Sequence, residues 1–360
     1  MDLYLIIVII MLALAVSGLV VGVANDAVNF LNSALGSKAA PRYVIMTVAS
    51  VGIIVGAITS NGMMEVARSG VFHPEMFTFA EVMLLFLAVM FTNVILLDIF
   101  NTLGMPTSTT VSLVFGLLGA AVGISIFKIA NDALVTLPDG SLATMADMIN
   151  TGNAMAIIGG ILISVVIAFV CGTVVMYITR LIFSFRYQSK LKSYGAVWCG
   201  IALTAISYFA VFKGLKGTQV IPADWMSWME GHIPMMLGGL LVGWSLIMSI
   251  LSMLKVNILR ITVLAGTFSL ALAFAGNDLV NFIGVFVAGV DAYDIVRTTG
   301  DTNMLMGGLN DPVVANLLIL FLSGAVMVVT LWFSKKAQSV SDTEINLAPV
   351  SYTHLTLPTT

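Results

Sequence analysis

Two segments of the sequence place the same polar pattern, Asn, Asp, two apolar residues and Asn, after a long apolar run. The first is VANDAVN at residues 23–29, and the second is AGNDLVN at residues 275–281. Their polar residues are Asn25, Asp26, Asn29, Asn277, Asp278 and Asn281. Carboxylate and amide oxygens are ligands that suit a hard cation such as Na⁺, so each segment is a candidate cation site. The alternative is that the Asn side chains only hydrogen-bond to neighbouring helices.

A third segment, GMPTSTT at residues 104–110, interrupts an apolar pattern. Gly104 and Pro106 break the helical periodicity, and apolar helix resumes only after four consecutive hydroxyl residues, Thr107, Ser108, Thr109 and Thr110. The pattern predicts a helix N-terminus. Its unpaired N–H groups and positive dipole end would favour a tetrahedral oxyanion. A Pro kink, with Ser and Thr bonded back to their own helix, would produce the same pattern.

The composition requires a membrane as the solvent for these segments. Hydrophobic residues make up 59% of the 360 residues and charged residues 9%, and the mean hydropathy is +1.06. One water-soluble core could not bury so much apolar surface, so we expect an all-α polytopic membrane protein. In that environment Asp26 and Asp278 each need a cation, a partner or a proton, because an intramembrane charge costs about 2.5–3.5 kcal/mol.

About nine apolar runs are long enough to span the membrane. They lie near residues 3–31, 43–63, 80–100, 108–127, 152–179, 195–212, 234–254, 257–290 and 312–334. Ten of the 15 basic residues fall in alternate connections: Lys38, Arg42, Arg180, Arg186, Lys190, Lys192, Lys255, Arg260, Lys335 and Lys336. The positive-inside rule assigns these connections to the cytoplasm. The chain is therefore expected to be a multi-pass protein of the cytoplasmic (inner) membrane with its N-terminus outside.

The two Asn/Asp segments should cross the membrane in opposite directions. The first predicted span runs from outside to inside, and the eighth runs from inside to outside. This arrangement is typical of the inverted-topology repeats with broken helices that form secondary transporters.

With these elements on one chain, the sequence resembles the inorganic phosphate transporter (PiT) family. The family signature G-A-N-D-V-A-N is similar to residues 23–29 and 275–281, although Val23 stands in place of the first Gly. The family's P-x-S-T-T element is similar to Pro106, Ser108, Thr109 and Thr110. The order of elements follows the family from residue 1 to about residue 335.

The resemblance implies a set of site residues and a function. Phosphate would be bound by Ser108, Thr109, Thr110, Asn25 and Asn277. Coupling cations, taken as Na⁺ at the two acidic clusters, would be bound by Asp26, Asn29, Asp278 and Asn281. The implied function is cation-coupled symport of inorganic phosphate without a cofactor or a nucleic-acid partner. Na⁺ is favoured over H⁺ because the Asn side chains add neutral oxygens to the carboxylates.

Other functions stay open at this stage. The substrate could be sulfate or another oxyanion. An anion channel is less favoured, because two separate acidic sites suit coupling better than continuous conduction. An intramembrane enzyme is less favoured, because Ser108 has no His or Lys partner within the apolar segments. Asn93, Asp98 and Asn101 either line the cytoplasmic approach to the anion site or cap the third span.

The expected organisation is a first transmembrane repeat at 1–179, connecting spans at 180–255, the start of a second, inverted repeat at 256–336, and a cytoplasmic tail at 337–360. The family's second repeat has its own Pro/Ser/Thr helix-end element, and none occurs between residues 290 and 360. We therefore expect a truncated chain whose last ten or so residues are unrelated read-through sequence. Some bacterial members that this sequence resembles continue into a PhoU-like domain, which would follow Ala348. A homodimer is left open.

Overall fold

The structure is a computed structural model, and it describes residues 2–60, 65–137, 140–183, 187–214, 222–311 and 316–347. In these residues the regular structure is helical, and strand pairing is limited to isolated bridges. Eight helices are long and apolar enough to cross a membrane: α1 (Asp2–Gly36), α2 (Arg42–Thr59), α4 (Phe79–Thr102), α5 (Thr109–Ala130), α7 (Thr151–Phe183), α8 (Tyr187–Phe209), α10 (Ile233–Met253) and α11 (Ile258–Thr299). A bent pair, α12 (Leu317–Phe333) and α13 (Lys335–Leu347), provides a ninth candidate span. The prediction of an all-α membrane protein with about nine spans is confirmed.

Short elements connect the long helices. They are α3 (Glu65–Arg68), η1 (Pro74–Met76), α6 (Met145–Met148), η2 (Ala210–Gly214), α9 (Ala223–Gly231) and η3 (Gly307–Asn310). The predicted read-through residues at the C-terminus lie outside the described residues.

Local sequence signals set the ends of the helices that carry the polar segments. The side chain of Asn257 accepts a hydrogen bond from the Arg260 N–H and begins α11, as an N-cap does. Gly300 ends that helix with φ 71°, a left-handed conformation in which glycine carries no Cβ penalty. α11 therefore continues about nine residues beyond the apolar run that the sequence predicts, because no helix-ending residue occurs before Gly300.

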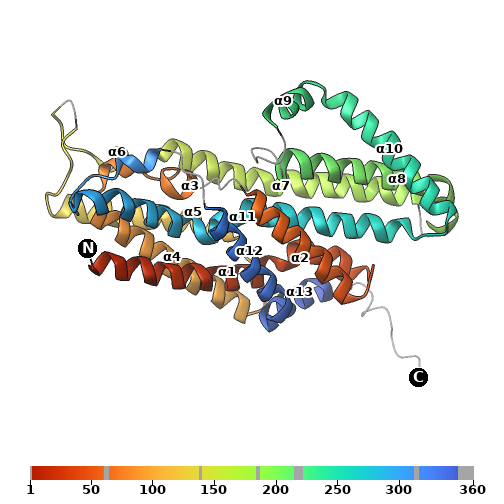
Figure 1. The fold of residues 1–360 in the computed structure, drawn as a ribbon, viewed down its shortest axis with the longest axis horizontal. Helices are drawn as coiled ribbons and strands as arrows, with labels where there is room; N and C mark the ends of the chain where they lie inside the picture. Colours follow the sequence, from red (N-terminus) through yellow and green to blue (C-terminus); the bar gives the residue numbers. More distant parts are fainter. Residues whose placement is uncertain are drawn as a thin grey trace.

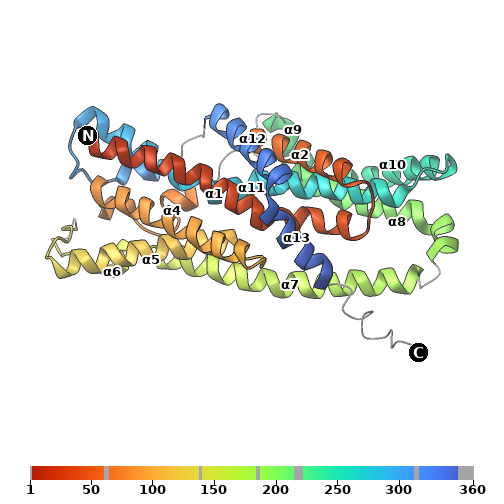
Figure 2. The same cartoon turned by 90° about the horizontal axis from the view of Figure 1, so that it is seen from below.

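The helices that carry the two Asn/Asp segments run in opposite directions. In Figures 1 and 2, α1 runs from left to right along the long axis, and α11 runs from right to left. Both helices are continuous through their Asn/Asp segments. The interruption lies instead at residues 103–108, between α4 and α5, near the middle of the long axis. Opposite directions agree with the predicted inverted repeat, which stays a prediction.

Small residues let α2 pack closely against α11. A Cβ atom on Gly56 would lie 2.2 Å from the backbone oxygen of Leu272, and one on Gly52 would lie 2.6 Å from that of Phe268. This is the small-xxx-small spacing that brings membrane helices into backbone contact. Just beyond this contact, Ser60 Oγ donates to the Gly276 carbonyl at 2.9 Å. The contact therefore fixes α11 directly before its Asn/Asp segment.

Backbone hydrogen bonds join the connections at the end of the molecule where α4 and α7 begin (Figure 1). The His73 N–H donates to the Met148 carbonyl at 2.9 Å, and the Phe79 N–H donates to the Met304 carbonyl at 2.9 Å. Lys128, which is 2% exposed, binds Glu81 Oε2 at 2.8 Å and so links the end of α5 to the start of α4. This end of the bundle is closed by bonds between elements far apart in the sequence.

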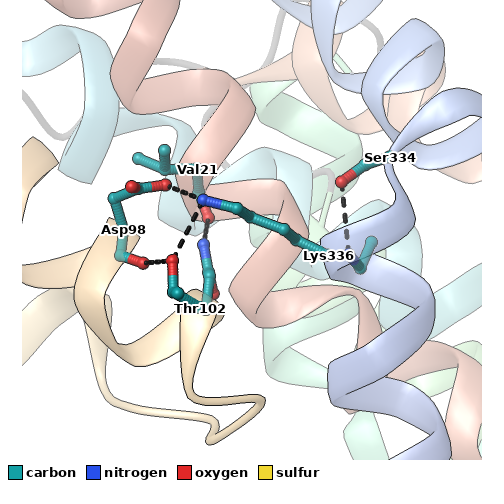
Figure 3. Close-up of polar contacts among 7 residues, drawn as sticks. Val21, Asp98, Thr102, Ser334 and Lys336 are labelled. Atoms are coloured by element: carbon teal, nitrogen blue, oxygen red, sulfur yellow. Dashed lines mark hydrogen bonds and ion pairs between the residues drawn. The ribbon is translucent and has the colours of Figure 1, made fainter.

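The opposite end of α4 is bound by the C-terminal helix α13. α12 and α13 meet at an angle of 66°, and α13 packs along α1. Figure 3 shows Lys336 reaching from α13 to the last turns of α4, where its Nζ donates to Asp98 Oδ1 at 2.6 Å and to Thr102 Oγ1 at 3.1 Å. α13 thus lies beside the interruption between α4 and α5.

The α2–α11 contact generates a stability prediction. Gly56→Ala should lower the free energy of unfolding by about 1–3 kcal/mol, because the new Cβ overlaps a backbone atom that cannot rotate away. Thermal unfolding in detergent measures this effect. Gly119→Ala on α5 is the matched control, since a Cβ there meets nothing within 4 Å, and it should be neutral or slightly stabilising. Equal unfolding temperatures for Gly56→Ala and the wild type would contradict the predicted packing.

Candidate functional site

The three predicted polar segments meet around one pocket of about 440 Å³. α1, the start of α5 and α11 each contribute to its wall, and the lining residues are Asp26, Asn29, Pro106, Thr107, Ser108, Thr109, Thr110 and Asp278. Six of the nine residues predicted for the site therefore line one cavity. The side chains of Asn29 and Ser108 are exposed, whereas Asp26 is 3% exposed.

Asn25 holds the interrupted segment against α1. Its Nδ2 donates to the Thr107 carbonyl at 2.6 Å, and its Oδ1 accepts from the Thr107 N–H at 3.1 Å. The same Nδ2 also donates to Asp26 Oδ1 at 3.0 Å. Asn25 is 1% exposed, so its amide binds backbone and a neighbouring acid behind the pocket wall. In this conformation it positions the start of α5 rather than facing a ligand.

A chain of hydrogen bonds joins the two acidic clusters. Thr109 Oγ1 donates to Asp26 Oδ2 at 3.0 Å. Asn281 Nδ2 lies 3.4 Å from Thr109 Oγ1 and 3.3 Å from Asp278 Oδ1. The two aspartates are therefore connected through one hydroxyl and one amide. Hydrogen-bonded carboxylates of this kind are partly satisfied before any cation binds.

The start of α5 has the features of an anion site. Ser108 caps the helix, and its Oγ accepts from the Val111 N–H at 3.2 Å. That bond occupies a lone pair and leaves the hydroxyl hydrogen for another acceptor. The first N–H groups of a helix have no partner within the helix, and the positive dipole end favours an anion. The structure thus presents neutral donors on one side of the pocket.

The charged groups of the pocket are all acidic. Asp26 and Asp278 line it, and Lys, Arg and His are absent from its lining among the described residues. An anion held only by hydroxyl and N–H donors would face two carboxylates without a fixed cationic side chain. A bound cation is the remaining means to offset that repulsion.

The structure does not bring every predicted residue to the pocket. Asn277 is exposed and lies outside the lining, and Asn281 is 8% exposed with its amide behind Thr109 and Thr110. The structure also shows where the polar residues near the end of α4 lie. Asn101 Nδ2 donates to the Val21 carbonyl on α1 at 2.6 Å, while Asp98 binds Lys336. Both residues lie outside the pocket lining.

Sequence reasoning missed one contributor, Ser112. Its Oγ donates to Asn93 Oδ1 at 2.6 Å, and Asn93 Nδ2 lies 3.4 Å from the Asn281 carbonyl oxygen. These bonds connect α4, α5 and α11 directly behind the site. A Ser one turn after Ser108 in an apolar helix was the available signal, but Ser is common between membrane helices and its partner is distant in the sequence.

A family profile and a curated relative are similar to this chain in sequence. A sequence profile described as the phosphate transporter family matches residues 22–338. A protein of Thermococcus kodakarensis, named as a candidate phosphate permease, is 25% identical over 200 residues. That match covers 55% of this chain and 45% of the relative.

A solved structure shares the fold. It is named the sodium-dependent phosphate transporter, and it matches with a TM-score of 0.65 and 19% identity over 94% of this chain and 78% of its own. At that identity the likeness shows the fold alone. The profile, in contrast, covers most of the chain and is described as a family of transporters. The chain belongs to the phosphate transporter family.

Proposed function

We propose that the protein carries inorganic phosphate across the cytoplasmic membrane as a secondary transporter, in symport with cations. The observation that carries the proposal is the pocket in which the capped start of α5 faces Asp26 and Asp278. The family and the relative named as a candidate phosphate permease support the substrate. Sulfate is the competing substrate, since hydroxyl and N–H donors suit any tetrahedral oxyanion.

Charge balance makes cation coupling part of the proposal. Two unit charges 4 Å apart repel by about 4 kcal/mol at an effective dielectric of 20, and a bound phosphate would face two carboxylates. A cation at each aspartate offsets this repulsion and makes anion binding depend on cation binding. Na⁺ is favoured over H⁺ because Asn29 adds an amide oxygen at the pocket and oxygen ligands suit a hard cation. The name of the similar solved structure agrees with this choice.

The exposure of the pocket suggests which side it faces. Asn25 and Asn29 lie one turn apart on the same face of α1, and Asn25 is 1% exposed whereas Asn29 is exposed. With the N-terminus outside, as the basic residues predict, the exposed side of the pocket faces the cytoplasm. The bonded connections where α4 and α7 begin would then close the outer side. The inverted repeats, at 1–179 and from 256 onward, would exchange these roles during transport.

Uptake of radiolabelled phosphate into proteoliposomes tests the function. The purified chain should accumulate phosphate inside vesicles under an imposed Na⁺ gradient, and excess unlabelled phosphate should compete more strongly than sulfate. Empty vesicles give the background. Uptake that sulfate suppresses as well as phosphate does would favour the competing substrate, and the absence of uptake above empty vesicles would contradict transport by this chain.

The choice of Na⁺ over H⁺ gives a first functional prediction. We expect an inward Na⁺ gradient at uniform pH to drive phosphate accumulation, because the carboxylate and amide oxygens can bind Na⁺ directly. An inward proton gradient in Na⁺-free choline medium should drive little accumulation. Both gradients are compared on one vesicle preparation with the membrane potential clamped. Equal phosphate accumulation in the Na⁺-free medium would contradict this prediction and would show that H⁺ is the coupling ion.

The two carboxylates give a second prediction. Asp26→Asn and Asp278→Asn should each reduce Na⁺-driven uptake about tenfold or more, because a hydrogen bond or ligand to a charged group contributes about 1.5–3 kcal/mol and 1.4 kcal/mol is a factor of ten. Both variants keep side-chain size and should still insert. Asp98→Asn is the matched control, since that acid lies outside the pocket. Normal Na⁺-dependent uptake by either pocket variant, at matched membrane amounts, removes that aspartate from the site.

The hydroxyl of Ser108 gives a third prediction. Ser108→Gly should raise the KM for phosphate about two- to tenfold, because one donor of about 0.5–1.5 kcal/mol is lost. Glycine retains most of the stability of an N-cap, whereas alanine does not. Ser108→Ala should therefore raise the KM and also lower the unfolding temperature. If only the Ala variant has a raised KM, the hydroxyl acts as a cap and not as a phosphate donor.

A further inference from the structure

The amide of Asn281 lies within reach of more acceptors than it can satisfy. Its Nδ2 is 3.0 Å from Thr110 Oγ1, 3.3 Å from Asp278 Oδ1 and 3.4 Å from Thr109 Oγ1. An amide nitrogen carries two hydrogens, so two acceptors at most receive a full hydrogen bond at one time. The position of Asn281 is fixed from behind, where Asn93 Nδ2 approaches its backbone oxygen. Its amide therefore divides its hydrogens between an acid and two hydroxyls.

Of the two hydroxyls, only that of Thr110 can change its hydrogen bonding toward the pocket when the Asn281 amide shifts between its acceptors. The hydroxyl of Thr109 already donates its single hydrogen to Asp26 Oδ2. Thr110 lines the pocket and accepts from Asn281. When a lone pair of its oxygen is occupied by the amide, its own hydrogen points away from Asn281. By comparison, Thr267 on α11 donates its hydroxyl hydrogen to the Val263 carbonyl at 3.2 Å, a bond that Thr110 does not make in the part of the chain that the structure describes.

We propose that Asn281 couples cation binding at Asp278 to anion binding at Thr110. A cation on Asp278 Oδ1 repels the amide hydrogen that shares this oxygen, so the amide turns fully to the threonines. Thr110 Oγ1 then accepts a full hydrogen bond from the Asn281 amide, and its own hydroxyl hydrogen is donated to a phosphate oxygen. The inference rests on the proposed function and adds a residue that strengthens the dependence of the two ligands on each other beyond the charge offset.

The coupling works equally in the other direction. A phosphate oxygen that accepts from Thr110 polarises the hydroxyl and makes its oxygen a stronger acceptor for the amide. The amide then no longer donates to Asp278, and the Asp278 Oδ1 atom becomes available to the cation. Linkage requires this reciprocity, and typical coupling between two ligands changes each affinity about 5- to 150-fold. The second N–H of the amide, directed at Thr109, keeps Asp26 within the same network.

The test measures coupling rather than activity alone. The KM for phosphate is determined over a range of Na⁺ concentrations, with choline as the replacement ion. Thermal unfolding of the purified protein is followed with Na⁺, inorganic phosphate or both. For the wild type we expect saturating Na⁺ to lower the phosphate KM about fivefold or more, and the two ligands together to stabilise more than the sum of their separate effects.

Thr110→Val is the decisive variant, since it replaces the hydroxyl with a methyl group at nearly equal volume. Its phosphate KM should be higher at every Na⁺ concentration and should fall less steeply than the wild-type KM as Na⁺ rises, because only the charge offset at the two aspartates remains. Na⁺ alone should still stabilise it. Thr110→Ser restores the hydroxyl and should restore the coupling. Thr267→Val is the matched control on α11 and should keep the wild-type coupling.

Asn281→Leu gives a second measure, and it should reduce the excess stabilisation by the two ligands together. If it fails to fold, the Thr110 variants decide. A Thr110→Val protein whose KM is raised by the same factor at all Na⁺ concentrations, with the Na⁺ dependence intact, overturns the relay and leaves Thr110 as a simple donor. A wild type that neither transports nor is stabilised by phosphate contradicts the proposed function instead. A wild type that binds phosphate independently of Na⁺ contradicts both Na⁺ coupling and the relay.

Discussion

In the proposed function, the main constraint on the site is the repulsion between a bound anion and the two carboxylates that share its pocket. In a low-dielectric environment this repulsion is large, and a fixed Lys or Arg would remove it at the expense of the dependence on cations. The pocket instead offers an anion only neutral donors, from Ser108, Thr110 and the first N–H groups of α5. Neutral donors would hold the anion while the two carboxylates would still need bound cations. A symporter needs this combination, because each ligand alone must bind poorly.

The fold provides these neutral donors because the break between α4 and α5 lies near the middle of the molecule (Figure 1). A helix N-terminus at pocket depth exposes backbone N–H groups that a continuous helix would bury in hydrogen bonds. Such an irregular segment in a membrane needs partners for its polar backbone. Asn25 supplies them to Thr107 through both atoms of its amide, and Asn101 binds the Val21 carbonyl one turn earlier on α1. α1 therefore supports the interruption as well as contributing Asp26.

The membrane spans could be predicted from the sequence, because a bilayer permits few backbone structures. Buried backbone groups must be paired within each segment, so a long apolar run in this composition becomes a helix. The clustering of Asp26, Asp278 and Ser108 could also be anticipated, since their spacing repeats a known family pattern. The contacts of Asn281 and Ser112 could not be anticipated, because they depend on the rotation of α11 against α4 and α5. That rotation follows from close packing at Gly52 and Gly56, and helical periodicity does not specify the partner helix.

The polar groups of the site also connect the two helices that carry its aspartates. Asp26 and Asp278 belong to helices that run in opposite directions, and no backbone segment connects them locally. Their connection passes through Thr109 on a third helix and Asn281 on α11. A displacement of α11 relative to α1 must therefore break or remake bonds at the start of α5, where the anion is proposed to bind. In the proposed function, a movement between these two helices and the occupancy of the pocket would therefore be linked by a few hydrogen bonds.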